Sequence, residues 1–286
     1  MGQPKMISVF LMESDEGPIL FETGPHSCMP YLEQGLAAYG YKKEDINHLF
    51  LTHIHLDHAG GAWEFAKHGA KIYVHPAGLK HLVDPSKLVA SATKLYKDKM
   101  DILWGKFKPT PEENLEVVEH NQVFHIGGKQ IRALHSPGHA NHHAAYATDE
   151  GMVCGDVAGI CIATGPPMPP CPPPDINFDF WRKSIEILIN ENPKTLHIAH
   201  FGTHENGVQH LKDLRRELDI LEEFSFDLYK KTPDRNEAYP KFNQWVRNRM
   251  LEICPNRKVA DYYAISMPTR MQLRGVFRYY VKREKI

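Results

Sequence analysis

The segment THIHLDHAGG (52–61) is the feature that most restricts what this chain can fold into. It places His53, His55, Asp57 and His58 within six residues, directly after an apolar run that has the composition of a buried strand. Alternate side chains of extended backbone project to the same side, and a turn after Asp57 would direct His58 to a second position. Imidazole and carboxylate groups crowded at a strand end favour a transition-metal site. The fold must therefore hold this loop at the edge of a sheet.

Further candidate ligands follow later apolar runs. His139 lies in SPGHANHH, Asp156 in MVCGDVAG and His200 in LHIAHFG. Because α/β folds keep their sites at one edge of the sheet, we expect all of these residues to lie near the first loop. Together with that loop they make five imidazoles and two carboxylates. This set suits two divalent ions, with Asp156 as the candidate bridge.

The first half of the chain alternates strand-like and helix-like segments, which indicates an α/β domain. The pattern predicts strands over 5–12, 18–22 and 71–75, a buried strand ending at Thr52, and helices over 30–39 and 62–68. Apolar residues near helical spacing predict a long amphipathic insertion over 86–107. Short β segments separated by Gly-Gly and Asp-Glu-Gly turns fill 115–156.

The second half begins with a proline-rich loop and continues mainly as helix. GPPMPPCPPP (165–174) cannot form helix or central strand, because proline fixes φ and removes a hydrogen-bond donor. A helix over 178–190, a strand over 195–200 and a leucine stripe over 208–228 follow. We therefore expect an α/β core over residues 1–205 and a C-terminal helical extension over 206–286 that packs on it.

Composition excludes several classes of protein. Lys+Arg 34 against Asp+Glu 35 gives a net charge of −1, so nucleic acid is not an expected partner. No apolar run approaches the roughly 18 residues of a membrane span, and the start lacks the pattern of a signal peptide. The five cysteines include no C-x-x-C pair, which disfavours a disulfide framework and a thiolate zinc site. The expected location is the cytoplasm.

In sequence order, these motifs resemble the metallo-β-lactamase superfamily, and the resemblance spans residues 18–202. It implies an αββα sandwich. It also implies one metal held by His53, His55 and His139, and a second held by Asp57, His58 and His200, with Asp156 bridging the two. The motifs THIHLDHAGG and SPGH are most similar to hydroxyacylglutathione hydrolases (glyoxalase II) and to related hydrolases and lactonases.

The resemblance implies two divalent ions per chain, with zinc expected and iron or manganese as alternatives. In the family mechanism a metal-bridging hydroxide attacks the substrate carbonyl, here of a thioester, lactone or activated ester. Asp57 is the predicted catalytic residue, because as a ligand it also orients the hydroxide. Two other activities stay open. One is a phosphodiesterase or ribonuclease, against which the near-neutral charge counts, although the basic terminal run RMQLRGVFRYYVKREK keeps it possible. The other is a persulfide dioxygenase.

Residues around the motifs receive subsidiary predictions. Glu22 stands where the family has Asp, and we expect its carboxylate to bond a metal-binding histidine. His143 is expected beside a ligand rather than as one. Cys161, His204 and His210 are expected to be packing or solvated residues. The substrate is expected to be a small molecule with a hydrophobic acyl or aryl part, and a homodimer is an open alternative. We expect the site to be walled by an apolar set that consists of Trp104, Met168, Phe178, Trp181, Tyr262 and Tyr263.

Overall fold

The computed structural model describes residues 5–284, which form two compact units. The first unit comprises Ile7–His135 and His142–Cys154, and the second comprises 5–6, Ser136–Asn141 and 155–284. The segment Ser136–Asn141 interrupts the first unit in sequence, yet its contacts place it in the second. The predicted division at residue 205 rests on composition and stays a prediction.

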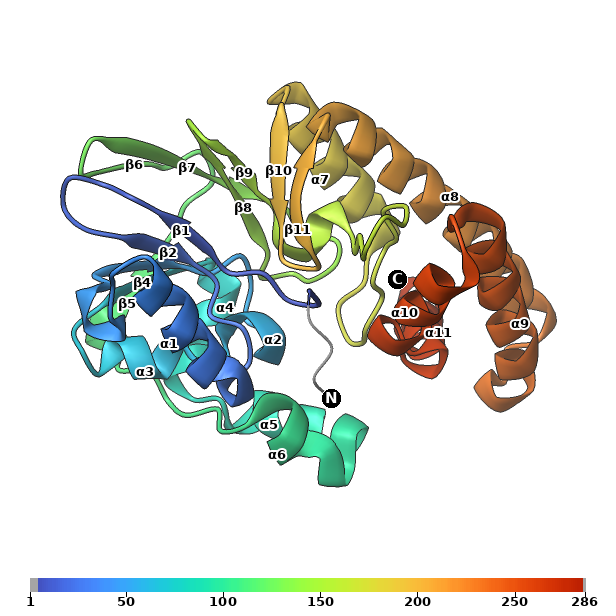
Figure 1. Ribbon diagram of the computed structural model, residues 1–286. Helices are drawn as coiled ribbons and strands as arrows, with labels where there is room; N and C mark the ends of the chain where they lie inside the picture. The colour runs from blue at the N-terminus through green and yellow to red at the C-terminus, as the bar shows by residue number, and fades with distance from the viewer. Residues whose placement is uncertain (1–4, 285–286) are drawn as a thin grey trace. The chain divides into compact units, whose positions relative to one another are not determined.

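The first unit contains a mixed five-stranded sheet, which consists of β1 (Phe10–Met12), β2 (Ile19–Phe21), β3 (His48–Phe50), β4 (Lys71–Val74) and β5 (Leu115–Val117). The strands lie side by side in sequence order (Figure 1). β1 runs antiparallel to β2, whereas the later neighbours are parallel. Parallel neighbours require crossover connections, which explains the alternation of strands and helices in the sequence.

Helices make these crossovers. They are α1 (Met29–Ala38), α2 (Leu56–Ala59), α3 (Ala62–Ala66), α4 (Pro76–Val83), α5 (Ser86–Tyr96) and α6 (Met100–Trp104). The helical insertion predicted over 86–107 is confirmed, but it is not one continuous helix. Lys97 has a positive φ of 50°, a left-handed conformation that no α-helix continues. The chain therefore turns between α5 and α6 through the 3₁₀ segment Lys97–Lys99.

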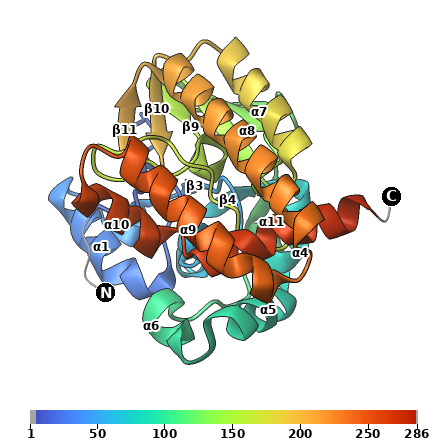
Figure 2. The same cartoon turned by 90° about the vertical axis from the view of Figure 1, so that its right-hand side faces the viewer.

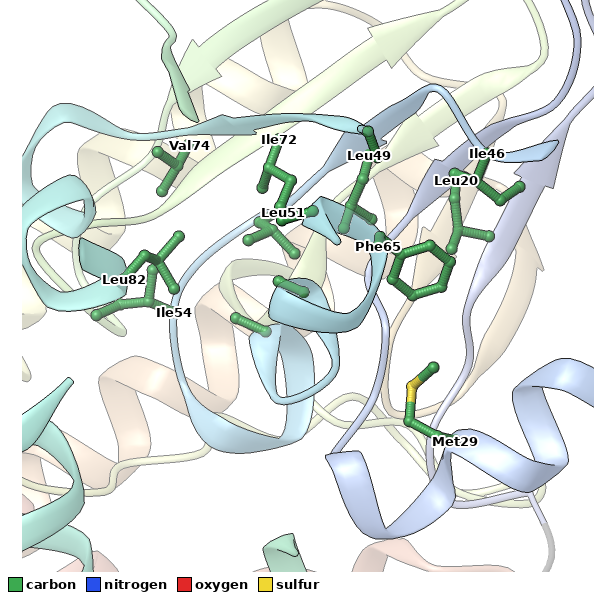
Figure 3. Packing of buried hydrophobic residues seen from close by; sticks show 14 of the residues in the cluster. Leu20, Met29, Ile46, Leu49, Leu51, Ile54, Phe65, Ile72, Val74 and Leu82 are labelled. Carbon is green, nitrogen blue, oxygen red and sulfur yellow. The ribbon is translucent and has the colours of Figure 1, made fainter. Parts of the chain in front are cut away.

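One face of the five-stranded sheet is covered by helices of the same unit. Leu20 and Leu49 on the strands pack in one buried cluster with Met29 of α1 and Phe65 of α3 (Figure 3). Leu49 and Phe65 are completely buried. Burying aliphatic and aromatic side chains stabilises a fold by roughly 1.5–3 kcal/mol each, so this cluster anchors the helices that flank the His-rich loop.

The opposite face packs on strands β6 (Val123–Ile126), β7 (Lys129–His135), β8 (Ala144–Thr148) and β9 (Gly151–Val153). These strands pair antiparallel in sequence order. Phe50 stacks on Tyr73 with ring centroids 4.0 Å apart and meets Tyr146 edge-on. The first unit is thus a helical layer on two face-to-face sheets, which confirms the expected α/β class.

The second unit contains an antiparallel pair of strands, β10 (Thr195–Ile198) and β11 (Gly202–Glu205), and the 3₁₀ segment η5 (Gly155–Ala158). Its helices are α7 (Phe178–Asn190), α8 (Gly207–Lys231), α9 (Arg235–Ile253), α10 (Arg257–Ser266) and α11 (Thr269–Arg283). The long helix α8 lies beside α7, and α11 packs against α8 and α9 (Figure 2).

Two helices of this unit contain segments that the sequence analysis singled out, the leucine stripe and the basic run. The leucine stripe of α8 is core, because Leu211, Leu214 and Leu218 are completely buried. The basic run at the end of the chain forms α11, whose opposite face buries Phe277 and Tyr280; Lys285 lies outside the described residues. No helix among residues 5–284 is long and apolar enough to cross a membrane.

The loop 165–174 has neither helix nor regular strand, as predicted, apart from a single bridge between Met168 and Ile160. It is tied to α11, because the Cys171 amide donates to Gln272 Oε1 at 2.7 Å. Gly275 of α11 lies so close to the Cys171 carbonyl that a Cβ there would collide with it. The loop is therefore a fixed part of the second unit.

The aromatic packing between the two sheets generates a stability prediction. We expect Phe50→Ala to lower the free energy of unfolding by about 3–5 kcal/mol, because it leaves a cavity in the closed inter-sheet core. Denaturant unfolding monitored by circular dichroism measures this. The matched control is Tyr31→Ala, whose side chain is 71% exposed and whose loss should change stability by less than about 0.5 kcal/mol. Equal effects in both variants would contradict the packing argument.

Candidate metal centre

The His-rich loop leaves strand β3 and enters helix α2 within a few residues. The backbone is extended at His55, which is the N-cap residue of α2, and Asp57 and His58 lie on the first turn of that helix. Extended backbone was predicted as far as Asp57, but it ends two residues earlier, at His55. The local reason is that helix α2 begins at Leu56, where the loop must turn back into the helical layer.

The change from extended backbone to helix at Leu56 divides the four side chains into two pairs. His53 Nε2 lies 3.0 Å from His55 Nδ1, and both precede the helix. His58 Nε2 lies 3.9 Å from Asp57 Oδ1, and both belong to it. Two donor atoms on one tetrahedral zinc ion lie about 3.3 Å apart, so each pair has a separation close to that of ligands on a common ion.

Glu22 supports both pairs from the end of β2. It is 1% exposed and has a φ of 68°, a conformation that costs a non-glycine residue of order 1 kcal/mol or more. Its Oε1 accepts a hydrogen bond from Thr52 Oγ1 and lies 3.3 Å from His58 Nδ1. Thr52 Oγ1 in turn lies 3.0 Å from His53 Nδ1. The predicted bond from Glu22 to a histidine of the loop is confirmed.

These bonds set the protonation of the imidazoles. A carboxylate only accepts, so His58 donates from Nδ1 and directs the lone pair of Nε2 away from Glu22. The Thr52 hydroxyl donates to Glu22 and accepts from His53 Nδ1, which leaves the lone pair of His53 on Nε2. In both residues Nε2 is therefore the nitrogen available to a metal ion.

Two further histidines lie against this loop. The His143 ring stacks on His53 with centroids 4.9 Å apart, and His142 meets His55 edge-on at 5.4 Å. His143 was predicted beside a ligand, and it is completely buried there. His142, for which the sequence suggested no role at the site, packs there against His55.

The second unit brings His139, Asp156 and His200 together. His139 Nε2 lies 3.4 Å from Asp156 Oδ2, and His200 Nε2 lies 3.6 Å from Asp156 Oδ1. The carboxylate thus has one imidazole facing each of its oxygens. All three residues are nearly inaccessible, with exposed fractions of 1%, 5% and 9% respectively.

The other ring nitrogen of each imidazole bonds a backbone carbonyl. His139 Nδ1 donates to the Pro170 carbonyl at 2.9 Å, and His200 Nδ1 donates to the Met6 carbonyl at 2.7 Å. Carbonyls only accept, so both rings carry their lone pair on Nε2, toward Asp156. Metal-binding histidines ordinarily have such a partner, and this donor set of nitrogen and carboxylate oxygen fits a divalent transition ion.

Helix α7 holds this trio in place. Gly138 has a φ of 146°, and a Cβ there would collide with the backbone of Trp181. The Trp181 indole donates to the Val157 carbonyl at 2.8 Å, and its ring lies 5.7 Å from that of His139. One buried side chain therefore positions the residues next to both His139 and Asp156.

Comparison with known proteins agrees with this site and fold. Residues 2–200 match the family model described as the metallo-beta-lactamase superfamily. The chain belongs to this superfamily. Membership implies that it binds divalent metal, and the His/Asp clusters of both units have the chemistry for it.

Individual members of the superfamily differ in how much of the chain they match. The metallo-beta-lactamase fold-containing protein ST1585 of Sulfurisphaera tokodaii is 26% identical over 76% of this chain and 82% of its own. The crystal structure of ST1585 from Sulfolobus tokodaii has a TM-score of 0.67 at 24% identity, covering 96% of this chain and 93% of that chain. At this identity the structural match shows the fold alone.

Two other similar proteins have names that state a reaction or a bound metal. The atrochrysone carboxyl ACP thioesterase AacuM of Aspergillus aculeatus is 31% identical over 39% of this chain and 27% of its own, so this chain spans about a quarter of AacuM. The crystal structure of TTHA1623 in a di-iron-bound form has a TM-score of 0.54 at 23% identity, covering 72% of this chain and 93% of that chain.

Three of the residues predicted to wall the site are buried in the second unit. Phe178 is completely buried against Tyr279 and Tyr280, and Tyr263 is 1% exposed in a cluster of the second unit. Trp181 holds the segments beside His139, as described above. These residues seal the helices of their own unit, so they do not support the prediction of a hydrophobic acyl or aryl group on the substrate.

The bonds of Glu22 generate a prediction about metal affinity. We expect Glu22→Gln to weaken the binding of divalent metal by about 10–100-fold, because a neutral amide oxygen accepts the His58 Nδ1–H more weakly than a carboxylate does. Competition with a chromophoric chelator measures this. Glu116→Gln, on the partly exposed strand β5, is the matched control. An unchanged affinity in folded Glu22→Gln would show that the carboxylate does not act on the metal through His58.

Proposed function

We propose that this chain is a dinuclear metal-dependent hydrolase of thioesters, lactones or other activated esters. The observation that carries the proposal is the Asp156 carboxylate, which has His139 Nε2 on one oxygen and His200 Nε2 on the other. A carboxylate that is approached from both oxygens by nitrogen ligands has the form of a bridge between two ions. A single-ion site would need only one of these pairs.

The proposal divides the ligands between the two ions. His53, His55 and His139 bind one ion, Asp57, His58 and His200 bind the other, and Asp156 bridges them. Two observations support this division. The His-rich loop is already sorted into the pairs His53–His55 and Asp57–His58, and the two oxygens of Asp156 face the histidines assigned to different ions.

Two bound ions would supply a water of lowered pKa as the nucleophile and would polarise the scissile carbonyl. The protein residues position the reacting groups. Among the three acidic side chains at the proposed site, that of Asp57 is the most exposed, at 25% against 7% for Asp156 and 1% for Glu22. It is therefore the carboxylate that we assign to orient the attacking water, as well as to bind metal.

The cysteines support hydrolysis without a covalent intermediate. Burial raises the pKa of the Cys154 and Cys171 thiols well above the ordinary value, and it raises the pKa of Cys161 to about 11. Nucleophilic cysteines have lowered pKa values instead. The sequence also lacks the G-x-S-x-G motif of serine hydrolases, so an activated water is the nucleophile that the residues favour.

The substrate class rests on a relative and on charge. AacuM, which matches 39% of this chain, is named a carboxyl ACP thioesterase, and its chemistry is the attack of water on an acyl thioester. The net charge of −1 gives a polyanionic substrate no general attraction. We therefore place thioesters and related activated esters before phosphodiesters, and a small molecule before a nucleic acid, as the substrate.

The first prediction from this proposal concerns stoichiometry. Reconstituted with Zn²⁺ and freed of loosely bound metal, the protein should hold about two ions at the proposed ligands, measured by elemental analysis of Cys161→Ser so that the thiol described below does not contribute. A panel of thioesters, lactones and phosphodiesters is then assayed with the same sample. A single ion would favour a dioxygenase-type site, and turnover confined to phosphodiesters would replace the proposed substrate class.

The second prediction tests the bridge. Asp156→Ala should lose at least one ion and lower turnover by at least about 100-fold, more than is typical for a residue that acts only through a ligand. Its circular dichroism spectrum should stay that of the parent. Asp227→Asn on α8, whose side chain is 59% exposed, is the control and should keep both ions. An Asp156→Ala protein with full metal content and near-parental turnover would refute the bridging assignment.

A further inference from the structure

A second group of potential metal ligands lies in the second unit, apart from the seven proposed above. It consists of Cys161, on the loop after η5, His204 on β11 and His210 on the first turn of α8. All three were expected to be packing or solvated residues, because they are 43 and 6 residues apart in the sequence and match no ligand spacing. The tertiary structure nevertheless brings them together.

Their donor atoms converge on one point. Cys161 Sγ lies 3.8 Å from His204 Nδ1, and the rings of His204 and His210 have centroids 5.3 Å apart. One donor atom from each residue lies within 4.8 Å of the other two. On one tetrahedral zinc ion, sulfur and nitrogen ligands lie about 3.3–3.6 Å apart. Side-chain rotations that move the donor atoms by about an ångström would therefore bring them to the separations of ligands on one zinc ion.

Backbone carbonyls fix which nitrogen of each imidazole carries the lone pair. His204 Nε2 donates to the Phe201 carbonyl at 3.0 Å, and His210 Nε2 donates to the Ala158 carbonyl at 2.9 Å. In each neutral ring the lone pair is consequently on Nδ1, which for His204 is the atom beside the sulfur.

The local backbone maintains this arrangement. Asn206 has a left-handed φ of 60° between β11 and α8. The chain reverses there, which brings the rings of His204 and His210 together. Gly207 packs on the Pro193 carbonyl and Leu196, where a Cβ would collide. The Cys161 carbonyl accepts from the Phe201 amide at 3.0 Å and so holds the cysteine beside the start of β11.

We propose that Cys161, His204 and His210 form a separate mononuclear site for a thiophilic divalent ion, of which zinc is the expected one. A thiolate with two imidazoles selects zinc over magnesium and calcium, which prefer oxygen ligands. Three protein ligands leave the fourth position to water. On binding, the Cys161 thiol loses its proton to the solvent and the sulfur forms the bond to the ion, while both histidines stay neutral.

The ion would join three segments of the second unit. His210 already bonds Ala158 of η5, the segment that carries Asp156, and Cys161 and His204 lie on the loop and strand on either side of His200. A bound ion therefore stabilises the backbone around two proposed catalytic ligands without being one of the catalytic ions. Ligand binding to the native state raises its unfolding temperature.

Cobalt(II) distinguishes this site from the dinuclear one, because all seven ligands proposed there are nitrogen or oxygen. Titration of the full metal-free chain with Co²⁺ should produce a near-ultraviolet thiolate-to-cobalt charge-transfer band that saturates at about one ion per chain. Cys161→Ser should abolish the band and lower the total Zn²⁺ content by about one ion per chain. His204→Gln, which keeps the thiol, should weaken the Co²⁺ affinity of the band at least about tenfold.

The control is Cys254→Ser, which removes another buried thiol of the same unit and should leave the band unchanged. Circular dichroism establishes that each variant is folded. The absence of a charge-transfer band in the parent protein at saturating Co²⁺ would overturn the proposal, and so would a band that persists in Cys161→Ser. Neither result depends on whether the protein has hydrolase activity, because the readout is the sulfur–metal bond.

Discussion

The buried Asp156 carboxylate is the interaction on which the proposed centre depends. Removing a carboxylate from water is unfavourable unless opposite charge and hydrogen bonds compensate it. At 5% exposure, Asp156 has the imidazole nitrogens of His139 and His200 on its two oxygens. Divalent ions beside it would supply the missing positive charge, so metal binding and the stability of this part of the fold are expected to be coupled.

Hydrogen bonds to fixed acceptors orient the imidazoles of three proposed metal ligands. One ring nitrogen is engaged by a fixed acceptor, which determines where the other nitrogen directs its lone pair. The acceptor is the Pro170 carbonyl for His139, the Met6 carbonyl for His200 and the Glu22 carboxylate for His58. Each acceptor comes from a segment held by other contacts, such as the tie between Cys171 and Gln272 that fixes the proline loop.

Much of the secondary structure could be predicted from the sequence, because periodicity and turn residues report local backbone preference. The helix predicted over 30–39 is observed as Met29–Ala38, and that over 178–190 as Phe178–Asn190. The break at Lys97 could not be predicted, since no glycine or proline marks it and a lysine there adopts a positive φ. Likewise, Phe178, Trp181 and Tyr263 are of residue types suitable for a pocket wall, but packing buries them in the second unit.

The sequence by itself determined the family and the candidate ligands, because closely spaced histidines after strands have few other chemical uses. It also indicated Glu22 as a partner for a histidine. Only the tertiary structure decided how the loop divides into two pairs at the start of α2, which nitrogen of each imidazole is available, and that Cys161 meets His204 and His210. Local pattern carries side-chain type and backbone preference, whereas the proximity of residues 43 positions apart depends on how the segments between them pack.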